Sequence, residues 1–481
     1  MPVTPYRTNL FQDRKDLYQF FLACQQASIE KKCTQIASIS LEIDPIDPLA
    51  VLHCLNKPSQ LSFYFEKRGQ DGGIGESSRR AIAGIGAVTS LKVEGPQRFI
   101  QAQSFIESCL TNTIKTGDLS LPFSGPHFLG GFTFFEEASA KNTYFPTATL
   151  FLPRWQISCQ GSRSVLVANF LIDASANLES LTEKAWHKFQ KITTIKYRVP
   201  EVNFKRQEIF DQRDITDTKY FKLAVLSALE AIQAKQFDKI VLAHAIDVIS
   251  PTLFHVVYSL SNLRRFYPDC YVFCLSNGKG QNFIGASPER LLSIQDQELL
   301  TDALAGSFPR GKTALEDANL ARGLLNSEKE IREHQVVIDF LTQSLSRLGL
   351  TPRRSLSPHL LQLSNIQHLR TPIRATVSAD VPLLKILAEL HPTPAVAGAP
   401  RDIACQRIRS YEAFERSLYA APLGWLDHKG NGEFIVGIRS ALVNGCSARL
   451  YAGAGIVAGS DPEKELTEIK LKLQALLQAL V

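Results

Sequence analysis

Residues 237–248, FDKIVLAHAIDV, and residues 283–293, FIGASPERLLS, are the stretches that decide the fold. Each contains a strand-like apolar run, which is typical of a strand buried in a sheet. Each run also carries one ionisable residue, Lys239 in the first and Glu289 in the second. The pattern indicates a base and an acid that a sheet scaffold holds apart.

The composition indicates an ordinary folded α/β protein. Hydrophobic residues make up 44% and charged residues 21% of the 481 residues, close to the averages of soluble globular chains. The net charge of +6 is small and the basic residues are dispersed, so we expect no nucleic-acid partner. No apolar run reaches about 18 residues, and the polar amino terminus does not resemble a signal peptide, so we expect no membrane partner. Nine cysteines without a CxxC motif predict reduced thiols and a cytoplasmic protein.

Strand-like runs dominate the first 200 residues and favour large antiparallel or mixed sheets over a regular βαβ repeat. Helices are predicted over residues 98–115 and 176–192. Residues 195–215 are polar and lack periodicity, so they are a candidate linker. The predicted strands are 33–43, 61–67, 81–93, 128–137, 147–158 and 164–173.

The second half is predicted to open with a helix over 216–235, followed by the strand of Lys239, a helix over 252–266 and a hairpin that delivers Glu289. A helix of about 20 residues should begin after Ser327, which forms a capping box with Glu330. Its apolar stripe is Val337, Ile338, Leu341 and Leu345, and Glu333 lies one turn earlier at the edge of that stripe.

The segment 432–470 predicts two strands, a glycine-rich turn and a closing helix that Ser460 or Asp461 caps. Glu465 and Glu468 are three residues apart and therefore share one face of that helix. Together with Glu333 they could hold Mg²⁺, which prefers carboxylate oxygens. The alternative is that these acids complement the helix dipole and that Lys464 pairs with Glu468.

The second half of the chain contains eight motifs in a fixed order: KIVLAHAIDV, FIGASPERLLS, DALAGSFPRG, NSEKEIREHQVVIDFL, LHPTPAVAGAP, YAAPLGW, GEFIVGIRSALV and YAGAGIVAGSDPEKELTEIK. In this order they resemble the chorismate-utilising enzymes, a family that includes isochorismate, anthranilate, aminodeoxychorismate and salicylate synthases. The segments FYFEK, AIAGIGAV and FLGGFTFF extend the resemblance into the first 200 residues.

The resemblance implies an α/β fold of the α+β type, in which two large, mostly antiparallel sheets pack together with helices outside. Residues 1–200 would form the amino-terminal portion and residues 201–481 the chorismate-binding catalytic portion of one compact unit. The active site would lie in a deep cleft near the carboxyl-terminal elements. The candidate linker then becomes a surface connection within that unit.

The residues at three positions distinguish the activities within the family from one another. Lys239 stands where anthranilate synthase-like sequences carry glutamine, which implies water as the nucleophile. Ala305 stands where aminodeoxychorismate synthase carries a nucleophilic lysine, and Ala395 where ammonia-using enzymes and salicylate synthases tend to carry threonine. The resemblance therefore implies a magnesium-dependent isochorismate synthase that needs no glutaminase subunit and acts as a monomer.

The resemblance also implies roles for individual residues. Lys239 would be the general base for water and Glu289 the general acid. The metal ligands would be Glu333 and Glu468, with Glu465 beside the metal. The histidines at 334 and 391 would only position other groups. The substrate site would comprise Ala305, Gly306, His334, His391, Thr393, Ala395, Tyr419, Arg439, Gly453 and Gly455.

Two residues depart from the family pattern, because Ser417 and Ala421 replace glycines expected on either side of Tyr419. A positive φ angle at either position would cost about 1 kcal/mol. The proposed chemistry requires a neutral Lys239, whose pKa burial should lower, and a protonated Glu289, whose pKa burial should raise. The alternatives are a salicylate synthase and a chorismate-binding protein with an impaired site.

Overall fold

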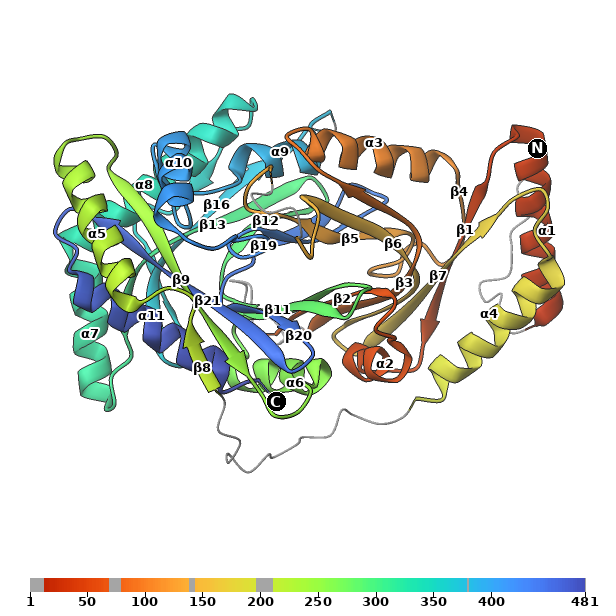
Figure 1. Ribbon diagram of the computed structural model, residues 1–481. Helices are drawn as coiled ribbons and strands as arrows, with labels where there is room; N and C mark the ends of the chain where they lie inside the picture. Colours follow the sequence, from red (N-terminus) through yellow and green to blue (C-terminus); the bar gives the residue numbers. More distant parts are fainter. Residues whose placement is uncertain (1–12, 69–78, 138–142, 196–210, 379, 481) are drawn as a thin grey trace.

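The computed structural model describes residues 13–68, 79–137, 143–195, 211–378 and 380–480 (Figure 1). The helices are α1 (Arg14–Lys31), α2 (Pro48–Leu55), α3 (Arg98–Thr111), α4 (Leu178–Thr193), α5 (Thr218–Gln233), α6 (Val256–Phe266), α7 (Ala314–Asn326), α8 (Glu328–Arg347), α9 (Leu383–Leu390), α10 (Arg401–Tyr411) and α11 (Pro462–Leu477).

The strands of the first portion are β1 (Gln35–Ile43), β2 (Leu61–Lys67), β3 (Arg80–Val93), β4 (Thr113–Gly117), β5 (His127–Phe132), β6 (Ala148–Gln160) and β7 (Arg163–Ile172). They are followed by β8 (Asp211–Asp214), β9 (Lys239–Ile249), β10 (Tyr271–Asn277), β11 (Gln281–Ser287), β12 (Arg290–Gln295), β13 (Glu298–Pro309), β14 (Arg353–Arg354), β15 (His359–Gln362), β16 (Ile366–Thr376), β17 (Gly398–Ala399), β18 (Pro422–Asp427), β19 (Gly432–Val436), β20 (Ser440–Asn444) and β21 (Ser447–Val457).

The long strands β3 and β6 pair along most of their length and form a stem from which the sheet forks. Residues 148–151 of β6 pair with β5, whereas residues 155–160 of the same strand pair with β7. One arm runs from β3 through β2, β10, β11, β20 and β21 to β9. The other runs from β5 through β18, β19, β12 and β13 to β16.

Both arms are antiparallel throughout, and among the described strands only β1 and β4 pair in parallel. This confirms the expected architecture of large, mostly antiparallel sheets. The pairings of β2 with β10 and of β5 with β18 join strands of residues 1–200 to strands of the catalytic portion.

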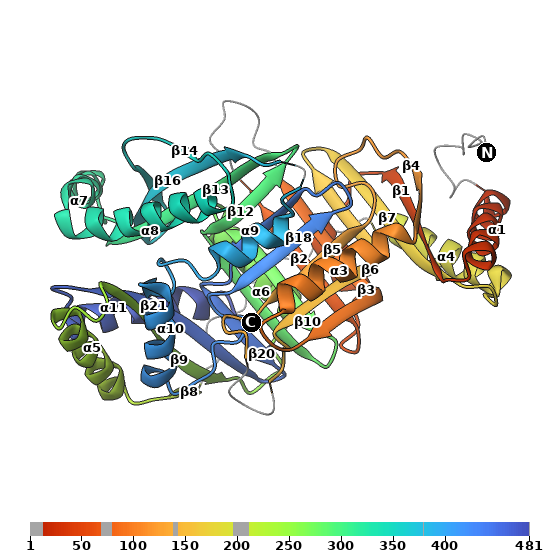
Figure 2. The same cartoon turned by 90° about the horizontal axis from the view of Figure 1, so that it is seen from above.

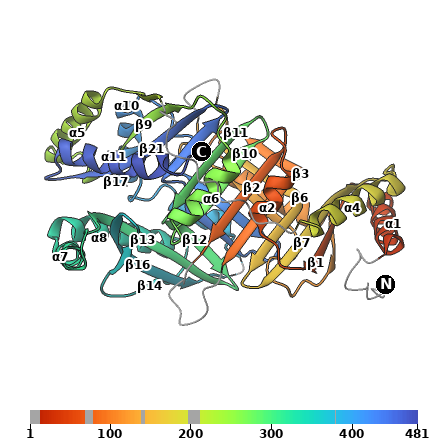
Figure 3. The same cartoon turned by 90° about the horizontal axis from the view of Figure 1, so that it is seen from below.

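Helices cover the outer sides of the arms. Helices α5 and α11 pack against β21, and α7 and α8 pack against β13. In the views from above and from below, the group of β9, β21, α5 and α11 lies beside the group of β13, β16, α7 and α8 (Figures 2 and 3). The distal ends of the two arms are therefore neighbours in space, although they are far apart along the sheet.

Local signals explain where the two helices beside the site begin. Ser327 is the N-cap of α8, and its side chain accepts a hydrogen bond from the Glu330 amide at 3.4 Å, as the capping box predicts. The apolar stripe of α8 is at most 3% exposed. Asp461, not Ser460, caps α11 by accepting hydrogen bonds from the amides of Glu463 and Lys464.

Several predicted boundaries were wrong. The helix predicted over 98–115 ends at Thr111, because Thr113 and Ile114 begin β4 and β-branched residues favour strands. The helix predicted over 252–266 begins only at Val256. Residues 196–210 of the candidate linker lie outside the described residues, whereas 211–214 form the exposed edge strand β8.

All nine cysteines lie in the described ranges, and none of them forms a disulfide. Among the described helices, none has both the length and the apolar composition that a membrane span requires.

Candidate active site

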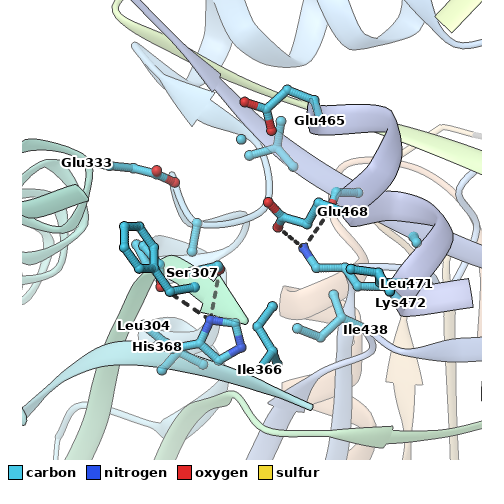
Figure 4. Close-up of a pocket in the computed structure, with 18 of the residues that line it drawn as sticks. Leu304, Ser307, Glu333, Ile366, His368, Ile438, Glu465, Glu468, Leu471 and Lys472 are labelled. Atoms are coloured by element: carbon cyan, nitrogen blue, oxygen red, sulfur yellow. Dashed lines mark hydrogen bonds and ion pairs between the residues drawn. The ribbon is translucent and has the colours of Figure 1, made fainter. Parts of the chain in front are cut away.

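The distal ends of the two arms enclose a cavity of about 710 Å³ (Figure 4). Its walls come from β13, β16 and α8 on one side and from β21 and α11 on the other. The sequence-predicted residues that line it are Glu289, Ala305, Gly306, Glu333, Ala395, Tyr419, Arg439, Gly453, Gly455, Glu465 and Glu468. Eleven of the fifteen predicted site residues thus line the cavity.

Lys239 is the first residue of β9 and is only 1% exposed. Its Nζ lies 2.7 Å from Glu333 Oε1, so the predicted base is ion-paired with a predicted metal ligand from the opposite arm. Gly455, on the neighbouring strand β21, makes room for this pair. A Cβ atom at residue 455 would lie 2.7 Å from the Glu333 carboxylate and 3.3 Å from Lys239 Cε.

Glu289 lies at the junction of β11 and β12 and is 4% exposed. Its amide donates to Ser287 Oγ at 3.1 Å, and its carbonyl accepts from the Val436 amide, so the backbone is fixed on both sides. Burial raises the pKa of Glu289 from its ordinary value of 4.5 to about 8, with Lys239 opposing the rise and Asp302 adding to it. Glu289 is therefore protonated at neutral pH and can donate a proton.

Arg439 lies between β19 and β20 and supplies a half-buried cation to the cavity. Its Nη2 lies 3.0 Å from His368 Nε2, whereas Nη1 is buried without a hydrogen-bond partner among the described residues. His368 must accept the Arg439 proton and so be neutral, and burial holds the pKa of His368 well below its usual value. The other ring nitrogen, Nδ1, then donates to Ser307 Oγ at 2.9 Å (Figure 4). The guanidinium lines the cavity, and such a group is suited to a substrate carboxylate.

Tyr419 lies deep in the cavity wall and is 3% exposed. Its ring stacks on Tyr451 with centroids 5.1 Å apart. Gly453 accommodates its hydroxyl, since a Cβ atom at residue 453 would lie 2.8 Å from the Tyr419 oxygen. Ser417 has the positive φ of 48° expected of a glycine site, but the second left-handed residue is Ala420, at 59°, and not Ala421.

Carboxylates from both arms face the same side of the cavity (Figure 4). Glu333 projects from α8, and Glu465 and Glu468 project from α11. Burial, reinforced by the neighbouring Glu468 and Glu333, raises the pKa of Glu465 to about 7. Burial and the nearby Glu333 also raise the pKa of Glu330. A divalent cation would relieve this repulsion, so the donor chemistry fits a hard metal ion such as Mg²⁺.

The carboxylates are nevertheless held apart as they stand. Within the described ranges, no three side chains of His, Cys, Asp or Glu are close enough to form a metal site. Glu333 is paired with Lys239 and Glu468 with Lys472, at 2.7 and 2.6 Å. The expected alternative partner of Glu468, Lys464, is not the one observed.

Four predicted residues do not line the cavity, and three of them hold its surroundings. His334 Nε2 lies 2.8 Å from Thr371 Oγ1, which ties α8 to β16. His391 Nε2 lies 3.0 Å from the Phe134 carbonyl, and burial lowers the pKa of His391 to about 3. The Thr393 carbonyl accepts hydrogen bonds from Val396 and Ala397, which fixes the turn that presents Ala395. The fourth residue, Lys239, reaches the site through Glu333.

Sequence reasoning missed several residues of the site. Glu330 was assigned only to the capping box, although its place one turn before Glu333 on α8 was a usable signal. Lys472 follows Glu468 at the i,i+4 spacing, which was also a usable signal. His368 and Tyr451 reach the cavity through strand pairing that no local pattern indicates.

Comparisons with known proteins agree with this geometry. The family model described as chorismate binding enzyme matches residues 22–481. The chain is 32% identical to the salicylate biosynthesis isochorismate synthase of Pseudomonas aeruginosa, over 92% of this chain and 90% of that protein. It is also 32% identical to the isochorismate synthase MenF of Bacillus subtilis, over 74% of this chain and 75% of that protein.

Solved structures share the fold. The menaquinone-specific isochorismate synthase MenF of Escherichia coli superimposes with a TM-score of 0.75 at 28% identity, over 95% of this chain and all of that one. Anthranilate synthase component I of Streptococcus pneumoniae has a TM-score of 0.66 at 20% identity, over 85% of this chain and 94% of that one. The second likeness concerns the fold alone.

Proposed function

The chain belongs to the chorismate-binding enzyme family, and on that premise we propose that it is an isochorismate synthase, an isomerase that converts chorismate to isochorismate. The relatives that match most of its length are named isochorismate synthases. The observation that carries the proposal is a Glu289 that burial keeps protonated in the cavity wall, together with a buried Lys239 amine held beside the cavity on Glu333.

Lys239 and Glu289 suit the two halves of one exchange of hydroxyl groups, in which Lys239 acts as the base and Glu289 as the acid. The Lys239 amine takes a proton from water as the water oxygen bonds to ring C2. The Glu289 carboxyl donates its proton to the C4 hydroxyl as the C4–O bond breaks and water leaves while the ring double bonds shift. One water enters and one leaves, and solvent returns the proton from Lys239 to Glu289. Such acid–base assistance contributes about 10² to 10⁴-fold for each group.

Other residues of the chain bind and orient the substrate. Arg439 lines the cavity and would bind a substrate carboxylate, while His368 fixes the guanidinium at Nη2. Ala305 and Ala395 leave space in the cavity wall. A larger side chain at either position would fill that space and add a reactive group. Tyr419, stacked on Tyr451, supplies a rigid hydroxyl beside Gly453.

Glu333 and Glu468 would hold a magnesium ion, with Glu465 beside it. When bound, the ion would supply positive charge that offsets the repulsion between a dianionic substrate and the acidic wall. Lys239 must leave its ion pair with Glu333 before it can serve as a base, because the carboxylate stabilises the ammonium.

Product analysis tests the proposal directly. The purified protein is incubated with chorismate and Mg²⁺, with and without ammonia, and the products are separated by chromatography. Isochorismate is the expected product in both reactions. Anthranilate in the presence of ammonia would overturn the assignment of water as nucleophile, and salicylate would show that pyruvate elimination follows the first step.

The remaining expectations concern the setting of the enzyme. We propose that it works without a glutaminase subunit, because water replaces ammonia in the reaction. The monomeric state and the cytoplasmic location stay predictions, and size-exclusion chromatography and cell fractionation test them.

A further inference from the structure

Each of the three candidate metal ligands is paired with a lysine. Lys239 Nζ lies 2.7 Å from Glu333, and Lys472 Nζ lies 2.6 Å from Glu468. Lys329 Nζ lies 3.7 Å from Glu465 and at the same distance from Glu330. These pairs set three ammonium groups against four carboxylates.

The three lysines differ in how firmly they are held. The Lys239 side chain is 2% exposed, whereas those of Lys472 and Lys329 are 20% and 36% exposed. Lys472 also donates to the Gly453 carbonyl at 2.8 Å, so its Nζ bridges α11 and β21. Lys472 is therefore oriented on Glu468 and is not a freely rotating surface charge.

The carboxylates need such counter-charges. Four acidic groups that face one partly buried space repel one another, and burial makes the repulsion costly. An ammonium at 2.6 to 2.7 Å offsets part of that cost. A divalent cation that binds Glu333 Oε1 and Glu468 Oε1 would supply the same compensation, and at these two oxygens it competes with the lysines.

We propose that three lysines, Lys239, Lys329 and Lys472, neutralise the carboxylates in the metal-free protein. A divalent cation then binds by exchange and displaces Lys472 from Glu468 and Lys239 from Glu333. This inference rests on the proposed function for the identity of the metal. The exchange couples metal binding to catalysis, because a metal ion that binds Glu333 releases Lys239 to act as the base. A metal-free protein keeps Lys239 paired and inactive.

Lys472→Gln tests the exchange without any turnover. Magnesium alone is titrated into the metal-stripped, full-length protein and followed by calorimetry. Removal of the competing ammonium should tighten Mg²⁺ binding about fivefold, the factor that corresponds to a half-exposed ion pair. The metal-free variant should also melt at a lower temperature than the metal-free wild type, and saturating Mg²⁺ should close most of that gap.

Two matched variants separate exchange from a general charge effect. Lys464 lines the same cavity from α11 but lies in no ion pair among the described residues, so Lys464→Gln should change Mg²⁺ affinity less than twofold. Lys472→Arg keeps a paired cation and should restore wild-type affinity. Unchanged or weaker Mg²⁺ binding by Lys472→Gln would overturn the proposal, as would an equal gain from Lys464→Gln.

The result of the Mg²⁺ titration does not depend on whether the protein converts chorismate. A protein that follows this binding pattern but makes no isochorismate refutes the proposed function and leaves the exchange standing. A wild-type protein that binds no Mg²⁺ at millimolar concentration refutes the exchange.

Discussion

At the scale of a single residue, the burial of Glu289 affects both the stability and the activity of the protein. With a folded pKa of about 8 and an ordinary value of 4.5, the folded protein retains a proton that the unfolded chain has lost across this window. The stability of the wild type must therefore fall as pH rises from about 4.5 to 8, by up to about 1.4 kcal/mol per pH unit. Activity should fall as pH rises through 8, because the acid loses its proton.

Glu289→Gln should separate these effects. The amide cannot ionise, so the variant should be more stable than the wild type at pH 8 and equally stable at pH 4, while losing about 10²-fold or more of its turnover. Urea unfolding at both pH values measures the difference. Glu107→Gln, at an exposed position of α3, is the control and should show no such divergence. Parallel stability curves for Glu289→Gln and the wild type would contradict the buried proton.

Lys239 can be tested with a pair of variants. Lys239→Gln removes both the base and the partner of Glu333, whereas Lys239→Arg keeps a cation that does not release its proton. Both should lose about 10² to 10⁴-fold in turnover, because neither supplies a base. Only Lys239→Arg should retain most of the wild-type melting temperature. Near wild-type turnover by Lys239→Gln would show that another group activates water.

At the scale of elements, the loop between α10 and β18 stores strain beside Tyr419. Ser417 adopts a φ of 48°, which costs a residue with a Cβ atom about 1 kcal/mol. Ser417→Gly should therefore raise the free energy of unfolding by up to about 1 kcal/mol. Ala421 is not among the left-handed residues, so Ala421→Gly should lower it by about 0.5 to 1 kcal/mol. Thermal unfolding of both variants compares them, and a loss from Ser417→Gly would contradict the strain.

The same loop is anchored by a buried ion pair between Arg416 and Glu412, at 2.5 Å. Arg416 also donates to the carbonyls of Val241 and Val396, which both line the cavity. Glu412→Gln leaves a buried, unpaired guanidinium and should cost about 3 to 5 kcal/mol.

Chemical denaturation measures that loss against an exposed pair. Arg347 and Glu389 lie 2.7 Å apart, but the Arg347 side chain is 56% exposed. Glu389→Gln should therefore change stability by less than about 1 kcal/mol. Similar losses at Glu412 and Glu389 would contradict the anchoring role of Arg416.

Sequence patterns predicted elements where the signal is local. The capping box of α8 and the β-rich runs of β1 to β3 gave the correct element type. The patterns missed α1, α2, α7, α9 and α10, although Asp13 caps α1 and Thr313 caps α7, and both caps were usable local signals. The fork at β6 and the Lys239–Glu333 pair join residues far apart in the chain, so only the family resemblance indicated this part of the arrangement of the site.

At the scale of the whole molecule, the two arms join through the stem of β3 and β6 and meet again around the acidic wall of the cavity. Chelation of magnesium should therefore abolish turnover while the fold persists, because the sheet pairing does not depend on the ion. EDTA treatment, followed by activity and circular dichroism before and after added Mg²⁺, measures this. Persistent turnover after complete chelation would contradict a magnesium requirement.

The position of α11 has a consequence for the timing of activity during biosynthesis. Ribosomes synthesise Lys239, the proposed base, and Glu289, the proposed acid, long before Glu465, Glu468 and Lys472. A nascent chain that already carries both proposed catalytic groups still lacks one side of its acidic wall. Conversion of chorismate must therefore wait for translation to pass this helix and for the helix to dock on β21.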